Sequence, residues 1–562
     1  DTVIRTATHT FYGTALRMAA LSVMGSPGWR EGREYSTVVA GAAGEQRSIL
    51  QTWMNRNQTD NSLVSPTELA AANDPRVAKT VTTEGSSVTR EELTFSNDAY
   101  NNLKKRCVFD GTATTVPLIC QGTDYVVDTA YTGLTRHIRG LPSGQWTARY
   151  SSGGTETIDA QATAIYDAYS GDSGPLLDRP GITEQESGWG PSLSTRGNAT
   201  SISRWQNGGT WSTSYAGYDI AGNVVKVTGA GVTTAGGVVV KPVTSISYAD
   251  SWAGSGVTST STFAAATQIT NALNQVTSGT FDFQTGLPLT RGDANGKVTS
   301  FEYSDTMERL SKLTKPDGLG TLRVDYDTVN MKVTQRESLD ATREILTETQ
   351  VDGLGRVTRI ERTGAGAARI VQSRQYDALG RVTGESMPGF GSPGAIETTT
   401  FDGLDRPLNQ TAGDGLAVTR IRYDGRSVVT VDAGGVYAKR TVDAAGRLVE
   451  VVEDANATVD GVARTGANLS TYYSYDSRGL LLTVTQGDRP VRTFLYDGLG
   501  ALTQTAQPES GTSVYSYDLA GNLQTKTDGA LRVTSIEYDA LSRMTKRTYS
   551  DGTPAEVYCY DG

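Results

Sequence analysis

The chain has 562 residues, 63 glycines and a formal net charge of −10, with 51 Lys and Arg against 61 Asp and Glu. The charges occur without long blocks, which argues against a nucleic-acid groove or a face that binds acidic lipids. No apolar run reaches the roughly eighteen residues of a membrane span, so we expect no transmembrane segment. The start, Asp1-Thr2-Val3, lacks the basic and apolar regions of a signal peptide.

Residues 1–90 are the least repetitive part, and we predict an irregular N-terminal β region there. The segment 76–83 alternates apolar and polar residues, which is typical of a half-buried strand. Residues 91–260 are predicted to be degenerate repeats with longer loops, two of which open with Tyr166-Asp167 and Tyr218-Asp219.

Residues 261–562 are predicted to be regular repeats. Residues 264–276 are the best helix candidate by propensity. They also fit the repeat pattern, and we therefore predict a strand, a turn and a strand.

The last ninety residues repeat one short pattern with small changes. Aspartate follows tyrosine at Asp476, Asp497, Asp518, Asp539 and Asp561, so the steps are 21, 21, 21 and 22 residues. A fixed period of this size indicates a repeat architecture. The chain ends within the fifth copy, and we expect it to be part of a longer protein.

One unit shows the physics of the repeat. Residues 497–500 read Asp-Gly-Leu-Gly, in which Asp can bond the backbone ahead of it and Gly supplies a positive φ. Residues 501–505 and 512–517 then alternate apolar and polar side chains around a second turn. Each unit is therefore predicted to be a β-hairpin, which is marginal alone and gains stability beside its neighbours.

The same pattern recurs upstream as Val351-Asp352-Gly353-Leu354-Gly355-Arg356 and in three further copies that begin at Tyr376, Phe401 and Val442. The pattern Tyr-Asp-x-x-Gly-Arg/Asn-Leu at about 21-residue spacing resembles the bacterial RHS/YD-repeat proteins. The resemblance is strong over about 260–562 and weaker over 90–260. It implies an all-β fold in which consecutive hairpins form a long, spiralling antiparallel sheet that coils into a hollow shell or tube.

The recurring Tyr and Asp are predicted to be structural, because a binding site needs only a few copies, whereas every unit carries them. Aligned tyrosines could alternatively form a stacking face for sugars. The predicted turn residues are Tyr218, Asp219, Tyr376, Asp377, Gly380, Arg381, Tyr475, Asp476, Tyr496, Asp497, Tyr517, Asp518, Gly521, Tyr538 and Asp539.

Cys107 and Cys120 lie thirteen residues apart. They are either two buried thiols or a disulfide across the base of a hairpin, and export of the protein would permit the disulfide. Cys559 is left over. With three cysteines, two histidines and no Cys-x-x-Cys, we expect no zinc site.

No residue is predicted to be catalytic, and no metal or cofactor is expected. Gly171-Asp172-Ser173-Gly174-Pro175 mimics the nucleophile segment of trypsin-like proteases, but neither His9 nor His137 has a matching context. We interpret Ser173 as a turn residue. Arg291-Gly292-Asp293 resembles an integrin-type tripeptide, but Asp293 already fits a repeat turn.

The resemblance implies a structural protein, exported or at the cell surface, that is not an enzyme. In that family the shell can enclose a C-terminal toxin or other cargo, which would be the partner here. The family's Asp-Pro-x-Gly-Leu motif before the toxin does not occur in this chain. Two alternatives stay open. One is a filament or tube that assembles from copies through unpaired sheet edges, and the other is an adhesin that binds cell-surface polysaccharide.

Overall fold

The computed structural model describes residues 5–11, 33–41, 44–56, 63–64, 74–96, 100–133, 136–182, 188–250, 262–316, 318, 320–340, 342–363, 368–459 and 462–560. These residues form one 41-stranded sheet and two small two-stranded sheets. Nearly every strand pairs antiparallel with the next strand along the chain, as in β22–β23, β23–β24 and β24–β25. The predicted fold, consecutive hairpins in one long sheet, is confirmed.

The first arc, residues 5–250, holds the N-terminal strands, a short helix and a 3₁₀ turn. Its elements are β1 (Arg5–Phe11), β2 (Glu34–Gly41), β3 (Gln46–Arg56), β4 (Leu63–Val64), β5 (Arg76–Glu84), β6 (Ser87–Phe95), β7 (Leu103–Asp110), β8 (Ile119–Tyr125), α1 (Thr129–Thr132), β9 (Pro142–Tyr150), β10 (Glu156–Tyr166), β11 (Ala199–Asn207), β12 (Thr210–Tyr218), β13 (Val224–Thr228), β14 (Val232–Thr233), η1 (Ala235–Gly237), β15 (Val239–Val240) and β16 (Val243–Ser247).

The single-layer arc, residues 262–401, continues the sheet with short hairpins. Its strands are β17 (Gln268–Thr270), β18 (Val276–Phe281), β19 (Pro288–Gly292), β20 (Val298–Glu302), β21 (Lys312–Thr314), β22 (Thr321–Asp327), β23 (Lys332–Ser338), β24 (Glu344–Val351), β25 (Val357–Thr363), β26 (Arg369–Tyr376), β27 (Val382–Ser386), β28 (Gly389–Phe390) and β29 (Ile396–Phe401). The predicted strand, turn and strand over 264–276 is present in β17 and the start of β18.

The return arc, residues 402–560, completes the chain. Its strands are β30 (Pro407–Thr411), β31 (Val418–Asp424), β32 (Ser427–Val431), β33 (Tyr437–Val442), β34 (Leu448–Glu453), β35 (Ala457–Val459), β36 (Val462–Arg464), β37 (Leu469–Tyr475), β38 (Leu481–Gln486), β39 (Arg492–Tyr496), β40 (Leu502–Gln507), β41 (Gly511–Tyr517), β42 (Leu523–Thr527), β43 (Val533–Tyr538), β44 (Met544–Tyr549) and β45 (Glu556–Val557).

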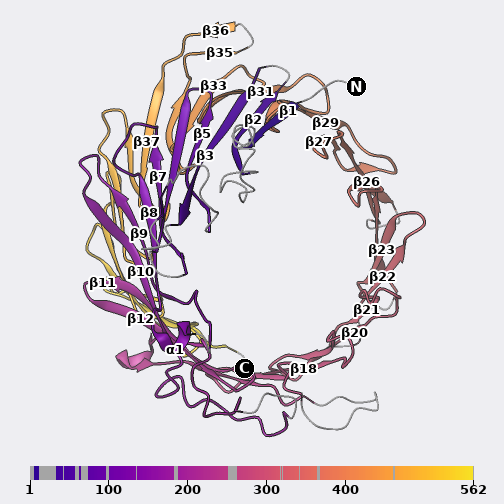
Figure 1. Cartoon of the computed structure of the whole chain (residues 1–562). Helices are drawn as coiled ribbons and strands as arrows, with labels where there is room; N and C mark the ends of the chain where they lie inside the picture. The colour runs from indigo at the N-terminus through magenta and orange to yellow at the C-terminus, as the bar shows by residue number, and fades with distance from the viewer. Residues whose placement is uncertain are drawn as a thin grey trace, which may run out of the picture.

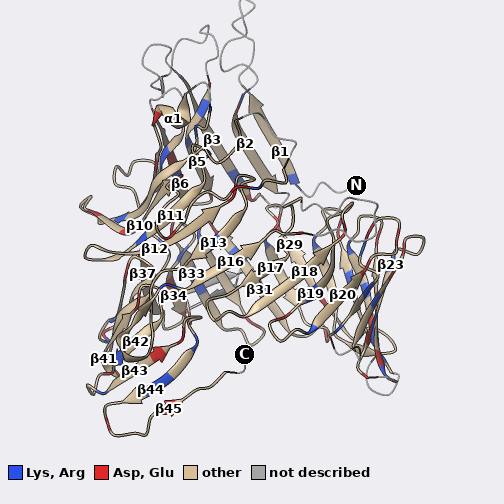
Figure 2. Cartoon of the chain, turned by 90° about the horizontal axis from the view of Figure 1, so that it is seen from below, with Lys and Arg blue, Asp and Glu red and all other residues tan. Residues whose placement is uncertain are grey.

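The sheet curls into a spiral of more than one turn. In Figure 1 the first arc runs down one side, the single-layer arc passes around the other, and the return arc comes back beside the first arc. Figure 2 shows the same overlap from below, with β37 next to β12 and β41 to β44 further along the return arc. Residue 90 lies within β6, and β16 pairs with β17 on either side of residues 251–261, which are outside the described part of the chain. The division of the chain at residues 90 and 260 remains a prediction.

A β-bulge at the start of the strand that follows many Tyr-Asp turns accounts for the curvature. The pairing register shifts at Gln375/Tyr376, Leu495/Tyr496, Ser516/Tyr517 and Glu537/Tyr538. At each of these positions the strand after the turn has one extra residue, so that two of its residues lie opposite one residue of the strand before the turn. A bulge bends its strand and increases the local right-handed twist. One bulge repeated in each unit therefore coils the sheet progressively.

The core is thin because the wall is a single sheet for much of its length. One buried cluster joins Val431, Tyr437, Val452 and Ala455 in the return arc, and another joins Cys107, Phe109 and Cys120 in the first arc. Many of the other buried groups are polar, including Asp219, Asp402, Asp476 and Asp518. Hydrogen bonding therefore carries much of the structure's specificity.

No helix in the described part of the chain is long and apolar enough to cross a membrane.

Candidate functional site

The aspartate of each Tyr-Asp turn holds the turn closed. In the turn after β26, Asp377 Oδ1 accepts the backbone N–H groups of Leu379 at 2.9 Å and Arg381 at 3.0 Å. Its Oδ2 accepts the Nε–H of Arg381 at 2.6 Å. Gly380 has a φ of 85°, a conformation that glycine adopts at little cost. One carboxylate thus satisfies three donors.

The other units keep this arrangement with small substitutions. The arginine follows four residues after Asp352, Asp402, Asp443 and Asp539 and pairs with each. Asparagine takes its place after Asp219 and Asp518, and Asp476 pairs with Arg478 instead. The hydrogen bond from Arg356 holds the pKa of Asp352 below its ordinary value.

The tyrosine before the aspartate ties its unit to the preceding one. The hydroxyl of Tyr376 donates to the carbonyl of Val357 at 2.7 Å, and that of Tyr517 donates to Leu502 at 2.9 Å. Tyr218 and Tyr538 make the same contact with Ala199 and Leu523. Burial raises the pKa of the phenols of Tyr475, Tyr496, Tyr517 and Tyr538.

The arginine also contacts the next unit, a role that was not predicted from the sequence. Arg381 Nη1 donates to the carbonyl of Asp402 at 3.0 Å, and the guanidinium lies 4.8 Å from the ring centre of Phe401. Arg447 likewise donates to Asp476 at 2.6 Å and lies over Tyr475. Cation–π contacts of this kind add to the hydrogen bonds. In the sequence, this contact could have been recognised from an arginine that is regularly followed, about 20 residues later, by an aromatic residue.

The turns define two edges of the sheet ribbon, because antiparallel strands reverse direction at each turn. The YD rim is the edge made by the Tyr-Asp turns, such as 352–356, 377–381, 402–406, 476–480, 497–501 and 518–522. The opposite rim is made by the intervening turns, such as 41–45, 84–87, 207–210, 339–343 and 528–532. We use the term seam for the line where the YD rim of the return arc meets the opposite rim of the first arc.

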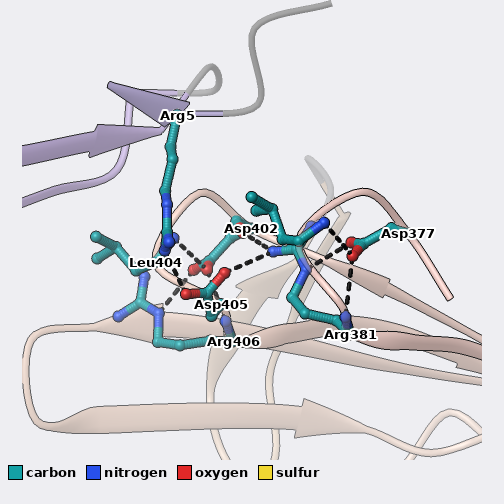
Figure 3. A network of polar contacts seen from close by, with 8 residues as sticks. Arg5, Asp377, Arg381, Asp402, Leu404, Asp405 and Arg406 are labelled. Atoms are coloured by element: carbon teal, nitrogen blue, oxygen red, sulfur yellow. Dashed lines mark hydrogen bonds and ion pairs between the residues drawn. The ribbon is translucent and has the colours of Figure 1, made fainter. Parts of the chain in front are cut away.

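The seam begins where β1 lies over the turn at 402–406, and Figure 3 shows its network. Arg5 pairs with Asp405, which also accepts from Arg381 at 3.0 Å. Arg406 pairs with Asp402 at 2.6 Å and, across the seam, with Glu84. Charge-assisted hydrogen bonds of this kind are the stronger ones. Arginines of the turn motif are thus shared between turn closure and lateral contact.

The seam continues along the return arc with ion pairs and backbone hydrogen bonds. Arg426 pairs with Asp110. The Ser477 N–H donates to Asp159 at 2.8 Å, and the Gly498 N–H donates to the carbonyl of Gln206 at 2.6 Å. Further contacts join Thr233 to Asp518, Ser212 to Leu519 and Gly231 to Ala520. The YD rim therefore closes the spiral on itself.

Residues 496–531 and 517–554 match the family model described as RHS Repeat. This part of the chain therefore consists of RHS repeats. No curated protein sequence matches it. Among solved structures it is similar to the TcdB2-TccC3 crystal structure, with 11% identity, a TM-score of 0.63, and coverage of 94% of this chain and 33% of that one.

Two further solved structures give the same fold. The pore of the Tc holotoxin of Photorhabdus luminescens has 10% identity and a TM-score of 0.67, covering 94% of this chain and 35% of that one. TcdB2-TccC3 without its hypervariable C-terminal region has 10% identity and a TM-score of 0.65, covering 98% and 38%. The chain thus spans about a third of the length of these chains.

Two of the three cysteines of the chain lie in the first arc. Cys107 on β7 and Cys120 on β8 are directly opposite each other and form a disulfide. Trp146 and Tyr150 pack against them. Cys559 is an exposed free thiol at the other end of the chain.

Ser173 is buried, and its hydroxyl is engaged within its own loop. Its Oγ lies 2.7 Å from the carbonyl oxygens of both Ala168 and Ser170 and accepts the N–H of Ser170 at 3.2 Å. Asp172 pairs with Lys241 at 2.5 Å. The loop therefore stabilises the insertion after Tyr166-Asp167, and the hydroxyl is directed at backbone groups.

Asp293 accepts the backbone N–H groups of Asn295 and Lys297, as a turn aspartate does. Within the described residues, no group of three or more His, Cys, Asp or Glu side chains is arranged to hold a metal ion. Grooves lie along the seam, and one of about 460 Å³ is lined by Gln145, Trp146, Arg204 and Leu499 among others.

Proposed function

We propose that this RHS-repeat chain is a structural protein, secreted or held at the cell surface, whose spiral sheet forms the wall of a shell around a toxin or other cargo polypeptide. The observation that carries the proposal is the seam, because it joins segments some 300 residues apart and turns an open ribbon into a ring. Arg406 meets Glu84 across it at a sequence separation of 322, and Ser477 meets Asp159 at a sequence separation of 318.

The distribution of polar groups supports a scaffold. The aspartates and arginines that recur in the turns are used for turn closure, for contact between units and for the seam. The tyrosine hydroxyls donate to backbone carbonyls, which favours a structural role over a sugar-binding face. The matched Tc structures include a chain without its hypervariable C-terminal region. A cargo at a corresponding position would be this protein's partner.

The test uses the native protein with any cargo that copurifies with it. Mass spectrometry after limited proteolysis should find a cargo polypeptide that survives in the intact protein. The double variant Arg406→Ala/Arg426→Ala removes two ion pairs across the seam, and we expect the cargo to become digestible because the wall opens.

The matched control is Arg336→Ala/Arg343→Ala, which removes two arginines from the single-layer arc. Their partners, Asp325 and Asp340, lie in the same arc, so the seam is untouched. The cargo should stay protected in this variant. Finding no cargo, or finding equal digestion in all three proteins, would contradict the enclosure proposal.

A further inference from the structure

The YD rim carries one apolar side chain at the tip of many of its turns, two residues after the aspartate. Along the single-layer arc these side chains are exposed: Met307 by 67%, Val329 by 87%, Leu354 by 78% and Leu379 by 42%. At the next turn, where the seam begins, Leu404 is only 8% exposed. Exposure falls as the row passes beneath the first arc.

Coverage by a rim explains the difference at Leu404. The turn 402–406 meets Arg5 and Glu84, and a Cβ added at Gly41 would lie 2.9 Å from the Cα of Gly403. The exposed turns have the same internal bonds, as the contacts of Asp352 with Leu354 and Arg356 show. Exposed apolar groups in a row mark an interaction surface.

The opposite rim of the return arc also presents apolar groups that the described residues leave exposed. Leu416 is 86% exposed, Leu531 is 81% exposed and Val436 is 49% exposed. They belong to the turns 412–417, 528–532 and 432–436, which lie on the same kind of rim that covers Leu404 in the seam. The described residues thus carry both halves of a seam that they do not close among themselves.

We propose that a second copy of this chain docks here. The YD rim of its single-layer arc, with Val329 and Leu354, lies on the opposite rim of the first copy's return arc, with Leu416 and Leu531. The contact repeats the seam and continues the spiral from one copy into the next. It pairs two different surfaces, so it is heterologous and generates an open helical stack. This proposal stands whether or not the ring holds cargo.

The test is sedimentation velocity of the purified chain over a wide range of concentration. The wild type should form assemblies that grow with concentration. Val329→Lys/Leu354→Lys breaks the YD rim, Leu416→Lys/Leu531→Lys breaks the opposite rim, and each should sediment as a monomer throughout. A mixture of the two variants retains one intact contact and should give a heterodimer and nothing larger.

The matched control is Leu495→Lys/Val514→Lys, which adds the same charge at side chains that are 51% and 47% exposed on strands β39 and β41. It should assemble like the wild type, and all the variants should share its thermal unfolding midpoint. A wild type that stays monomeric, or rim variants that assemble normally, would overturn the proposal. The proposal would also be overturned if Thr8→Pro, and neither rim variant, dispersed the assemblies. Proline in β1 blocks strand pairing at the sheet edge, so that result would mean that the copies pair through β1.

Discussion

The single-layer arc and the return arc use the same turn sequence in different surroundings. Asp352-Gly353-Leu354-Gly355 and Asp497-Gly498-Leu499-Gly500 are identical over four residues. A Cβ at Gly353 would meet nothing within 4 Å, whereas a Cβ at Gly498 would lie 2.4 Å from the carbonyl oxygen of Trp205. The motif therefore builds the turn locally, and a segment almost 300 residues away decides whether that turn is covered.

The aspartates show the same contrast. The Asp352 side chain is 24% exposed, while that of Asp402 is 0% exposed and Asp476 as a whole is 1% exposed. Their hydrogen bonds to the following backbone are alike. The seam thus withdraws already satisfied carboxylates from water, which costs less than burying unpaired ones. This explains how a row of charged turns can serve as a lateral contact.

The largest expected effect comes from removing a covered aspartate. Asp476→Ala removes the acceptor of the backbone N–H groups of Arg478 and Leu480 and of the Arg478 Nε–H. We expect a loss of about 3 kcal/mol, because breaking a buried pair strands the other charge. Asp352→Ala removes the same contacts at an exposed turn and should cost clearly less. Hydrogen exchange of β37 and β38, compared with β24 and β25, measures both, and equal losses would contradict the contrast.

The second largest expected difference between the two arcs is the loss of stability caused by a methyl group added to a turn glycine. Gly498→Ala places a Cβ against the Trp205 carbonyl and should destabilise the seam by about 2 kcal/mol, as overpacking does. Gly353→Ala makes the same change in open space and should stay within about 0.5 kcal/mol of the wild type. Urea unfolding midpoints provide the comparison. A Gly353→Ala protein as unstable as Gly498→Ala would show that the turn itself, and not the seam, requires glycine at this position.

The hairpins and their order could be predicted from the sequence because their determinants are local. Asp377, Gly380 and Arg381 close a turn within five residues, and the period of the motif fixes which strand pairs with which. The strand and turn over 264–276 were also predictable, since Asn271 accepts the N–H groups of Leu273 and Gln275 and forms the turn. The repeat pattern thus outweighed helix propensity.

The seam could not be predicted, since nothing in the local pattern specifies its pairs. Arg406 reads as one more turn arginine, and only the accumulated twist of the intervening strands brings it to Glu84. Small errors in twist per strand would shift the register of the whole return arc. The contact of Arg381 with the next unit could have been predicted from the recurring spacing of arginine and aromatic residues. From the sequence, Arg381 was predicted only as a residue of its own turn.

Acid should weaken the turns of the single-layer arc, as the smallest of these effects. The hydrogen bond from Arg356 lowers the folded-state pKa of Asp352. A depressed pKa contributes stability that is present above the unfolded value, about 4, and is lost as pH falls through the folded value. Asp352→Asn keeps an oxygen acceptor but does not titrate, so its urea midpoint should change less than the wild type's below about pH 4. Asp325→Asn, which removes an exposed carboxylate paired with the Arg336 side chain, is the control. A wild-type midpoint with the same acid dependence as that of Asp352→Asn would show that turn closure does not depend on the charge of this aspartate.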